Sequence, residues 1–192
     1  MNRKAQSSSE LAGVPGQAAR DCATAGVGVI WANAEYGLIT NRPILAGERL
    51  FQIEGELTAH PTRYSVQIDH NVHIDLGVGY SQEEIKSRYY WRFMNHHCEP
   101  SAMIRGRDVI AVRSLSLGSE VTFDYNTTEL EMAEPFDCRC GSPLCLGRIR
   151  GFQHLAPAEK LRLLPILAAH LTAPPLRTKP VATTSERTAV GV

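Results

Sequence analysis

Four consecutive residues, Asn95, His96, His97 and Cys98, place an amide, two imidazoles and a thiol side by side in the middle of this 192-residue chain. Amide and imidazole groups present hydrogen-bond donors and acceptors in fixed directions, and a thiolate or an imidazole can also bind a metal ion. An isolated Asn-His pair more often fastens a loop than takes part in chemistry. The rest of the sequence therefore has to supply partners before a function is assigned.

A metal site is indicated by three thiols that lie within eight residues, Cys138, Cys140 and Cys145. Zinc in a structural site takes four ligands in a tetrahedron, and thiolates are common among them. The chain starts with charged and serine-rich residues instead of an apolar leader, so a disulfide framework is not expected. The spacing predicts a zinc site and leaves its fourth ligand open among four candidates: Cys98, His96, His97 and His154.

A third segment, residues 120–125, reads Glu-Val-Thr-Phe-Asp-Tyr. In this order, residues 92–100, this segment and the cysteine-rich segment resemble the SET-domain protein-lysine methyltransferases, over roughly residues 27–152. The resemblance implies a mostly β SET fold with several small sheets of short strands, few short helices, a threaded, pseudoknot-like C-terminal segment and a zinc-bound post-SET segment. It also implies methyl transfer from S-adenosyl-L-methionine to the side-chain amine of a lysine in a protein substrate, a histone or another protein.

The resemblance assigns roles to individual side chains. It implies that Tyr125, Phe123 and Tyr64 form the catalytic part of the site, with Phe123 at the family position where Phe tends to permit higher methylation and Tyr restricts it. Cofactor binding is implied for six residues: Tyr36, Gly37, Arg92, Phe93, Asn95 and His96. The implied zinc ligands are Cys98, Cys138, Cys140 and Cys145. Zinc binding would then assemble the site, because it ties the Asn-His loop to the C-terminal segment.

Four residues depart from the family pattern: Glu35, Ile53, His97 and Ser101. Glu35 stands where a cofactor-side glycine is expected, and Ile53 where many relatives have a tyrosine in the lysine channel. A rival hypothesis is therefore a catalytically weak SET-fold module that zinc stabilises and that binds a protein or a peptide. A zinc-ribbon that binds nucleic acid is disfavoured, because lysine plus arginine and aspartate plus glutamate number 20 each.

Short β-rich runs separated by glycine turns predict small sheets instead of a parallel α/β layout. The predicted strands are 27–31, 36–40, 44–48, 50–56, 109–112 and 121–125, with a hairpin of 63–69 and 72–75 around His70-Asn71. Ser81 followed by Glu84 is typical of a capping box and predicts a short helix, while residues 89–91 are expected in the core. Pro157 predicts a first helical turn, and Pro165 should kink or divide the helix that follows.

The expected organisation is a mobile N-terminal arm over 1–26, a SET domain over 27–131, a post-SET zinc segment over 132–152, a C-terminal helix over 153–171 and a disordered tail over 172–192. A hydrophobic content of 43% is typical of a globular chain. The sequence has no run of eighteen apolar residues, so no membrane span is expected. We also expect no direct nucleic-acid binding, and a location inside the cell, cytoplasmic or nuclear.

Overall fold

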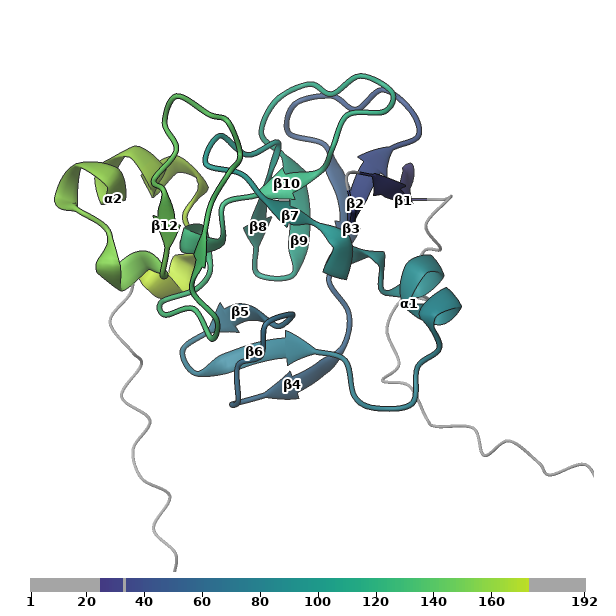
Figure 1. Ribbon diagram of the computed structural model, residues 1–192, viewed down its shortest axis with the longest axis horizontal. Coiled ribbons are helices and arrows are strands. Elements are labelled where there is room, and N and C mark those ends of the chain that lie inside the picture. The colour runs from purple at the N-terminus through teal and green to yellow at the C-terminus, as the bar shows by residue number, and fades with distance from the viewer. Residues whose placement is uncertain (1–24, 33, 173–192) are drawn as a thin grey trace, which may run out of the picture.

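The computed structural model describes residues 25–32 and 34–172, which form five small sheets with short helical segments between them (Figure 1). The strands are β1 (Val27–Ala32), β2 (Glu35–Thr40), β3 (Arg49–Gln52), β4 (Glu56–Thr58), β5 (Val66–Asp69), β6 (Val72–Asp75), β7 (Asn95–His96), β8 (Ala102–Arg105), β9 (Asp108–Ala111), β10 (Thr122–Phe123), β11 (Phe136–Asp137) and β12 (Arg148–Ile149). The helices are α1 (Gln82–Arg88) and α2 (Pro157–Leu163), and the 3-10 helices are η1 (Tyr90–Phe93), η2 (Tyr125–Thr127), η3 (Phe152–His154), η4 (Leu164–Ile166) and η5 (Ala169–Leu171).

Two antiparallel sheets of three strands, β3-β9-β8 and β4-β6-β5, make up much of the β structure. In Figure 1 the β4-β6-β5 sheet lies below the central strands. Its β5–β6 hairpin turns through Asn71, whose φ of 53° lies in the left-handed region that asparagine tolerates. The predicted hairpin around His70-Asn71 is therefore confirmed, as is the mostly β fold of small sheets and few short helices.

One parallel pair, β7 with β10, joins the Asn-His segment to the Phe-Asp-Tyr segment. Asn95 lies opposite Thr122 and His96 opposite Phe123, and the His97 N–H donates to the Phe123 carbonyl at 3.2 Å. Parallel strands need a long connection, which is supplied here by β8, β9 and the loops around them. This pairing brings together two segments that the sequence keeps apart, while the threading of the C-terminal segment stays a prediction.

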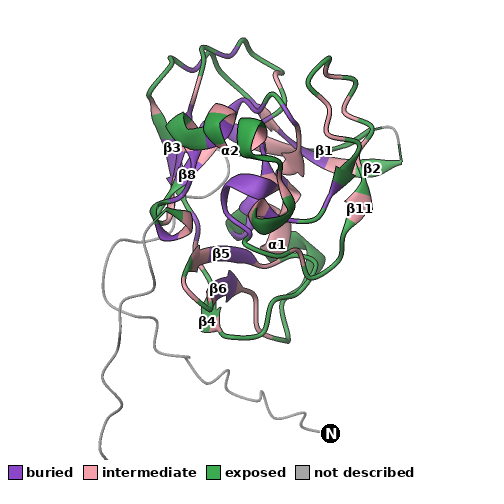
Figure 2. Cartoon of the chain, turned by 90° about the vertical axis from the view of Figure 1, so that its left-hand side faces the viewer, coloured by how far each residue is buried: buried purple, intermediate pink, exposed green. Residues whose placement is uncertain are grey.

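The core gathers buried apolar side chains from the first strands, from β6, β8 and β9, and from residues 89–91, as Figure 2 shows by colour. Tyr89, Tyr90 and Trp91 are buried, as predicted. They follow α1, whose N-terminus is fixed by the predicted capping box: the Glu84 N–H donates to Ser81 Oγ, and the Ser81 N–H donates to the Glu84 carboxylate.

The segment after the cysteines folds back onto the central strands. Pro165 ends α2 and passes the chain into 3-10 turns, so residues 153–171 form α2 with three 3-10 helices around it, not one helix. Arg162 Nη1 donates to the Cys98 carbonyl at 3.3 Å, and the Ala168 N–H donates to the Thr127 carbonyl at 2.9 Å. The predicted arm over 1–26 and tail over 172–192 lie outside the described residues, except for residues 25, 26 and 172.

No helix among the described residues has the length and apolar character needed to cross a bilayer.

Candidate functional site

A cleft of about 920 Å³ lies beside the β7–β10 pair. Eight of the residues predicted for catalysis, cofactor binding or zinc line it: Tyr64, Arg92, Asn95, His96, Phe123, Tyr125, Cys138 and Cys140. These side chains come from four separate parts of the chain: the loop before β5, the η1–β7 segment, the β10–η2 segment and the cysteine-rich segment. The cleft is therefore the place where the motifs of the sequence meet.

Tyr125 is held at both ends. Its hydroxyl donates to the Met94 carbonyl at 2.9 Å, and its backbone N–H donates to His96 Nδ1 at 3.2 Å. Burial raises the pKa of the Tyr125 hydroxyl well above its ordinary value, so the group stays protonated at neutral pH. Because the hydroxyl already donates its hydrogen bond to Met94, its oxygen can only accept hydrogen bonds from a ligand in the cleft.

Aromatic rings surround this hydroxyl. The Phe123 and Tyr125 ring centroids are 4.6 Å apart, and the Phe136 ring approaches Tyr125 at 5.9 Å and His96 at 5.6 Å in edge-on geometry. Trp91 also lines the cleft, and its Nε1–H donates to the Glu54 carbonyl at 2.9 Å. The aromatic side chains near Tyr125 are thus held in fixed orientations.

Asn95 presents one oxygen in a fixed direction. Its Nδ2 donates to the Tyr36 carbonyl at 3.0 Å and to Glu120 Oε1 at 2.9 Å, which uses both amide protons and settles which atom is the nitrogen. Within the described ranges, Asn95 Oδ1 makes no hydrogen bond. The Asn95 amide oxygen is therefore oriented to accept a hydrogen bond from a ligand.

Gly37 lies against this amide. A Cβ at Gly37 would be 3.2 Å from Glu120 Oε1 and 3.7 Å from Asn95 Nδ2. Glycine thus lets β2 approach the Asn95–Glu120 pair closely. Tyr36 and Phe93, which the resemblance also assigns to the cofactor, pack edge-on against each other at 5.2 Å, and Lys86 Nζ lies 4.5 Å from the centre of the Tyr36 ring.

Tyr64 and Arg92 form the rim. The Tyr64 side chain is exposed, and the Arg92 guanidinium lies over its ring at 4.6 Å from the centroid. Arg92 also comes within 3.8 Å of Asp75 Oδ1. Tyr64 is therefore placed by a cation–π contact at the mouth of the cleft, while Tyr125 lies deeper.

His96, in the lining of the cleft, and Asp124, which does not line it, are buried polar groups. Burial lowers the pKa of His96 to about 4, with His97 adding to the effect, so the ring is neutral near pH 7. Since Nδ1 accepts from Tyr125, the proton belongs on Nε2, which faces Cys98 Sγ at 3.3 Å. Burial also raises the pKa of Asp124 to about 6, although hydrogen bonds from Asn126 act in the opposite direction.

The four predicted zinc ligands come together. The Sγ atoms of Cys98, Cys138, Cys140 and Cys145 all lie within 4.8 Å of one another. Tetrahedral zinc with Zn–S bonds of about 2.3 Å separates its sulfurs by about 3.8 Å, so the donor set fits the ion. Cys98 is fully buried, and the Leu146 N–H donates to its sulfur at 3.4 Å. All four thiols are free of disulfides.

The other candidates for the fourth ligand point elsewhere. His97 Nδ1 accepts from the Glu99 N–H at 3.0 Å, and His154 faces Glu131 at 3.7 Å. His96 touches Cys98 without joining the cluster of four. The donor geometry therefore favours Cys98, the residue that the resemblance implied.

The departures from the family pattern lie in different surroundings. Glu35 and His97 line the cleft. Ser101 is buried, and its hydroxyl donates to the Glu120 carbonyl at 2.8 Å and accepts from the Thr122 N–H at 2.8 Å. Ile53 is fully buried within the core cluster. Ser101 thus holds the backbone at β10, and Ile53 contributes to core packing.

Residues 35–126 match the family model of the SET domain, a span that contains both strands of the β7–β10 pair and Tyr125. The cleft, the pair and the match together define a SET-type domain. Over residues 35–126 the chain is similar to the SET-domain family.

Two curated relatives illustrate the similarity. The chain is 43% identical over 67 residues to "Methyltransferase flvH" of Aspergillus flavus, covering 33% of this chain and 38% of that protein. It is 30% identical over 141 residues to "Histone-lysine N-methyltransferase, H3 lysine-36 specific" of Yarrowia lipolytica, covering 66% of this chain and 18% of that protein. The chain thus spans well under half the length of either relative.

A solved structure of KRYPTONITE in complex with mCHH DNA, H3(1-15) peptide and SAH aligns with a TM-score of 0.47 at 22% identity, over 62% of this chain and 28% of that one.

Several cleft residues were not foreseen from the sequence: Trp91, Met94, Glu129 and Phe136. Trp91 was expected only in the core, and it serves both places. Met94 contributes its backbone carbonyl, which no side-chain pattern reveals. Phe136 stands two residues before Cys138, and this proximity to a predicted metal ligand is the one signal that could have pointed to it.

Proposed function

We propose that this protein transfers a methyl group from S-adenosyl-L-methionine to a lysine side chain of a protein substrate. The observation that carries the proposal is the convergence of Tyr125, Phe123, Asn95 and His96 on one cleft in a SET domain. The relatives named as histone-lysine methyltransferases favour a histone as the substrate.

The cofactor would lie along Asn95, where the residues present fit its charged end. The cofactor supplies an electrophilic methyl group on a sulfonium. Asn95 Oδ1 is available to accept from an ammonium group, and the Glu120 carboxylate beside it favours positive charge. Glu35 lines the same cleft and adds negative charge. Tyr36, Gly37 and Phe93 support the Asn95 amide from behind.

Tyr125 would position the substrate amine. Because its oxygen can only accept, an amine N–H directed at it would leave the nitrogen lone pair facing another direction, which orients the nucleophile. Since burial keeps Tyr125 protonated, it acts by orientation and not as a phenolate base. Methyl transfer depends mainly on such alignment of the reacting atoms.

The apolar walls would help to neutralise the amine. A lysine in water has a pKa of about 10.4 and is mostly protonated at neutral pH. Phe123, Trp91 and Phe136 surround the cleft near Tyr125 with apolar surface, which disfavours an ammonium ion and so promotes the attacking form. Phe123 against the substrate would also set how many methyl groups fit.

Zinc would complete the site. Bound by Cys98, Cys138, Cys140 and Cys145, it would cross-link the Asn-His loop to the cysteine-rich segment. Phe136 lies two residues before Cys138 and contacts Tyr125, so the metal would also fix one wall of the cleft.

A transfer assay tests the proposal. The full chain, loaded with zinc, is incubated with methyl-labelled S-adenosyl-L-methionine and a panel of histones and histone peptides, and the products are read by mass spectrometry. We expect methyl-lysine with the wild type. Cofactor and peptide binding without transfer to any substrate would contradict the proposal and support the rival peptide-binding module.

A further inference from the structure

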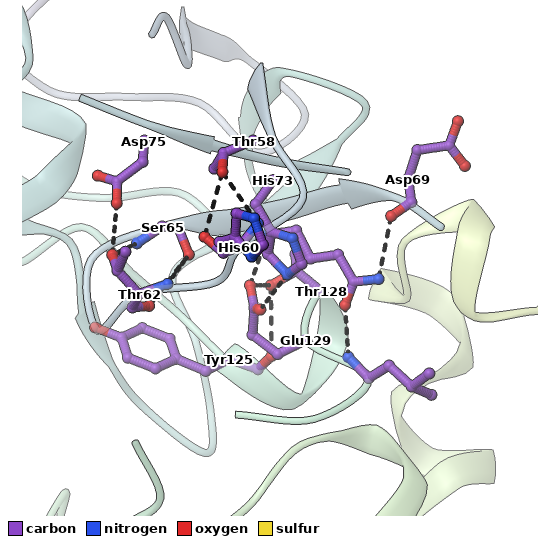
Figure 3. A network of polar contacts seen from close by, with 12 residues as sticks. Thr58, His60, Thr62, Ser65, Asp69, His73, Asp75, Tyr125, Thr128 and Glu129 are labelled. Atoms are coloured by element: carbon purple, nitrogen blue, oxygen red, sulfur yellow. Dashed lines mark hydrogen bonds and ion pairs between the residues drawn. The ribbon is translucent and has the colours of Figure 1, made fainter. Parts of the chain in front are cut away.

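Glu129 is an almost buried carboxylate on the wall of the cleft, in a segment for which no role was predicted. Its side chain is 7% exposed, and it lies four residues after Tyr125. A buried carboxylate is costly unless hydrogen bonds compensate for its lost hydration. Figure 3 shows it at the centre of a polar network between Tyr125, Thr128 and His73.

The first link of this network runs to β5. The Gln67 N–H donates to Glu129 Oε1 at 2.7 Å, across 62 positions of sequence. The Gln67 side chain returns the contact, since its Oε1 accepts from the Leu130 N–H at 2.9 Å. Two bonds in opposite directions fix both the distance and the angle between β5 and residues 129–130, and the one to the carboxylate is charge-assisted.

The second link runs to the catalytic turn. The Glu129 N–H donates to the Tyr125 carbonyl at 2.9 Å, and the Thr128 hydroxyl donates to Glu129 Oε1 at 3.3 Å. The Glu129 carbonyl accepts from the Phe152 N–H at 2.8 Å, which adds the segment that follows the cysteines. Glu129 is thus the point where β5, the Tyr125 turn and the C-terminal part of the domain meet.

The position of β5 matters because it continues the rim. Val66, the first residue of β5, and Tyr64 and Ser65 before it all line the cleft. Tyr125 lines the cleft from the opposite segment, so the separation of these two walls depends on what joins β5 to residues 125–130. The Gln67–Glu129 pair is the side-chain connection that does so.

We propose that Glu129, clamped to Gln67, is a positioning residue that sets the width of the substrate side of the cleft. Resting on the proposed methyl transfer, this assigns to Glu129 control over how the substrate lysine meets Tyr125. It gives Glu129 no part in holding the cofactor, because Asn95, Tyr36 and Glu120 form a separate set of contacts.

Four variants test the clamp: Glu129→Ala, Glu129→Gln, Gln67→Leu and, as a matched control, Glu131→Ala. Glu129→Ala removes the acceptor, whereas Glu129→Gln retains an oxygen that accepts from the Gln67 N–H. Gln67→Leu breaks the return bond while keeping similar volume. Glu131 is an exposed carboxylate two residues further on, which lies 3.7 Å from His154 Nε2.

We expect kcat/KM for the best peptide to fall by about 10- to 100-fold in Glu129→Ala, since small displacements at a reacting centre have effects of this order. In Gln67→Leu kcat/KM should also fall, and in Glu129→Gln it should stay within about threefold of the wild-type value. The affinity for S-adenosylhomocysteine, measured by calorimetry, and the zinc content should not change. The Glu131→Ala control should match the wild type throughout.

Three results would overturn the inference. One is a lower melting temperature of Glu129→Ala and Gln67→Leu with unchanged kcat/KM per folded molecule, which would make the clamp merely structural. Another is a loss of S-adenosylhomocysteine affinity as large as the loss of kcat/KM. If Glu129→Ala does not fold, unchanged kcat/KM in Gln67→Leu decides against the clamp. A wild type that transfers no methyl group to any peptide would instead remove the proposed function, and the inference with it.

Discussion

At the scale of single residues, the cleft works through atoms whose hydrogen bonds are already committed. The Tyr125 hydroxyl donates a hydrogen bond to the Met94 carbonyl, and the Asn95 amide donates to the Tyr36 carbonyl and to Glu120. What remains in each case is an oxygen lone pair with a fixed direction. Two acceptors placed in this way suit the proposed reaction, in which the cofactor carries an ammonium group and the neutral substrate amine still has N–H groups to donate.

Tyr125→Phe should lower the methyl-transfer rate by about a hundredfold or more, on the order of 3 kcal/mol in the barrier, because it removes a positioned polar group. The ring contacts with Phe123 and Phe136 remain, so folding, zinc content and cofactor affinity should change little. Rates and products are measured by mass spectrometry. Tyr80→Phe, at a partly exposed ring that packs on Tyr89, is the control. Equal rates in wild type and Tyr125→Phe would remove Tyr125 from the catalytic role.

Asn95→Ala should weaken the binding of S-adenosyl-L-methionine by more than about tenfold, or 1.4 kcal/mol. The change removes the oriented acceptor and also leaves the Tyr36 carbonyl without its donor. Calorimetry on the folded, zinc-loaded protein gives the affinity. Asn41→Ala, at an exposed asparagine whose Nδ2 donates to the Val27 carbonyl, should bind the cofactor like the wild type. A folded Asn95→Ala with unchanged affinity would move the cofactor to another part of the cleft.

At the scale of elements, the cysteine-rich segment acts as a wall of the cleft that a metal would hold in place. Short β11 and β12 form a two-stranded sheet of two residue pairs, which is too small to be stable alone. A zinc ion bound by the four nearby sulfurs would supply the missing stability. The position of Phe136 therefore depends on a bond outside the hydrophobic core.

Purified protein should contain close to one zinc per chain, and Cys98→Ser or Cys140→Ser should each weaken zinc binding by more than about tenfold. Metal analysis and competition with a chelator measure this. Cys22→Ser, at a cysteine outside the described residues, is the control. If Cys98→Ser binds zinc as tightly as the wild type while Cys140→Ser does not, the fourth ligand is a different residue.

At the scale of the whole molecule, the buried ionisable groups link stability to pH. Burial lowers the pKa of His96 from 6.5 to about 4 and raises that of Asp124 from 3.8 to about 6. The two shifts are of similar size and have opposite effects on how the free energy of unfolding changes with pH. Burial also lowers the pKa of His170, whose Nε2 lies 2.8 Å from the Thr128 carbonyl. The unfolded chain then binds the His170 proton more readily, so this contribution to stability is present above about pH 6.5 and is lost as the pH falls.

His170→Gln should therefore lose less stability than the wild type when the pH is lowered from 7 to 5. Glutamine can still donate to the Thr128 carbonyl, and it carries no proton that titrates in this range. Urea unfolding at pH 7 and pH 5 gives the change in the free energy of unfolding for each protein. A wild type and a variant that change in parallel would show that His170 does not titrate differently on folding. His60→Gln, at an exposed histidine, is the control.

The sequence predicted what is encoded in short runs. The capping box at Ser81 and the hairpin at Asn71 depend on neighbours a few residues apart, and the structure confirms them. The predicted strand 121–125 is shorter, at Thr122–Phe123, and residues 44–48 form only an isolated bridge at Ile44 instead of the predicted strand. The hydrogen bond between Gln67 and Glu129 could not be predicted from the sequence, because residues 62 positions apart share no periodic pattern. For the same reason the core position of Ile53 and the backbone acceptor at Met94 were invisible, since each depends on the tertiary packing.

The contact between Arg162 and the Cys98 carbonyl also bears on how the protein is made. It joins residues 64 positions apart, and the chain leaves the ribosome from its N-terminus. When Asn95 and His96 emerge, the segment that will cover their loop does not yet exist. Contacts of such long range also close slowly, because a large loop must be ordered first. A nascent chain therefore carries an unfinished cleft until the residues that follow Cys98, through Cys145 and Arg162, have been synthesised.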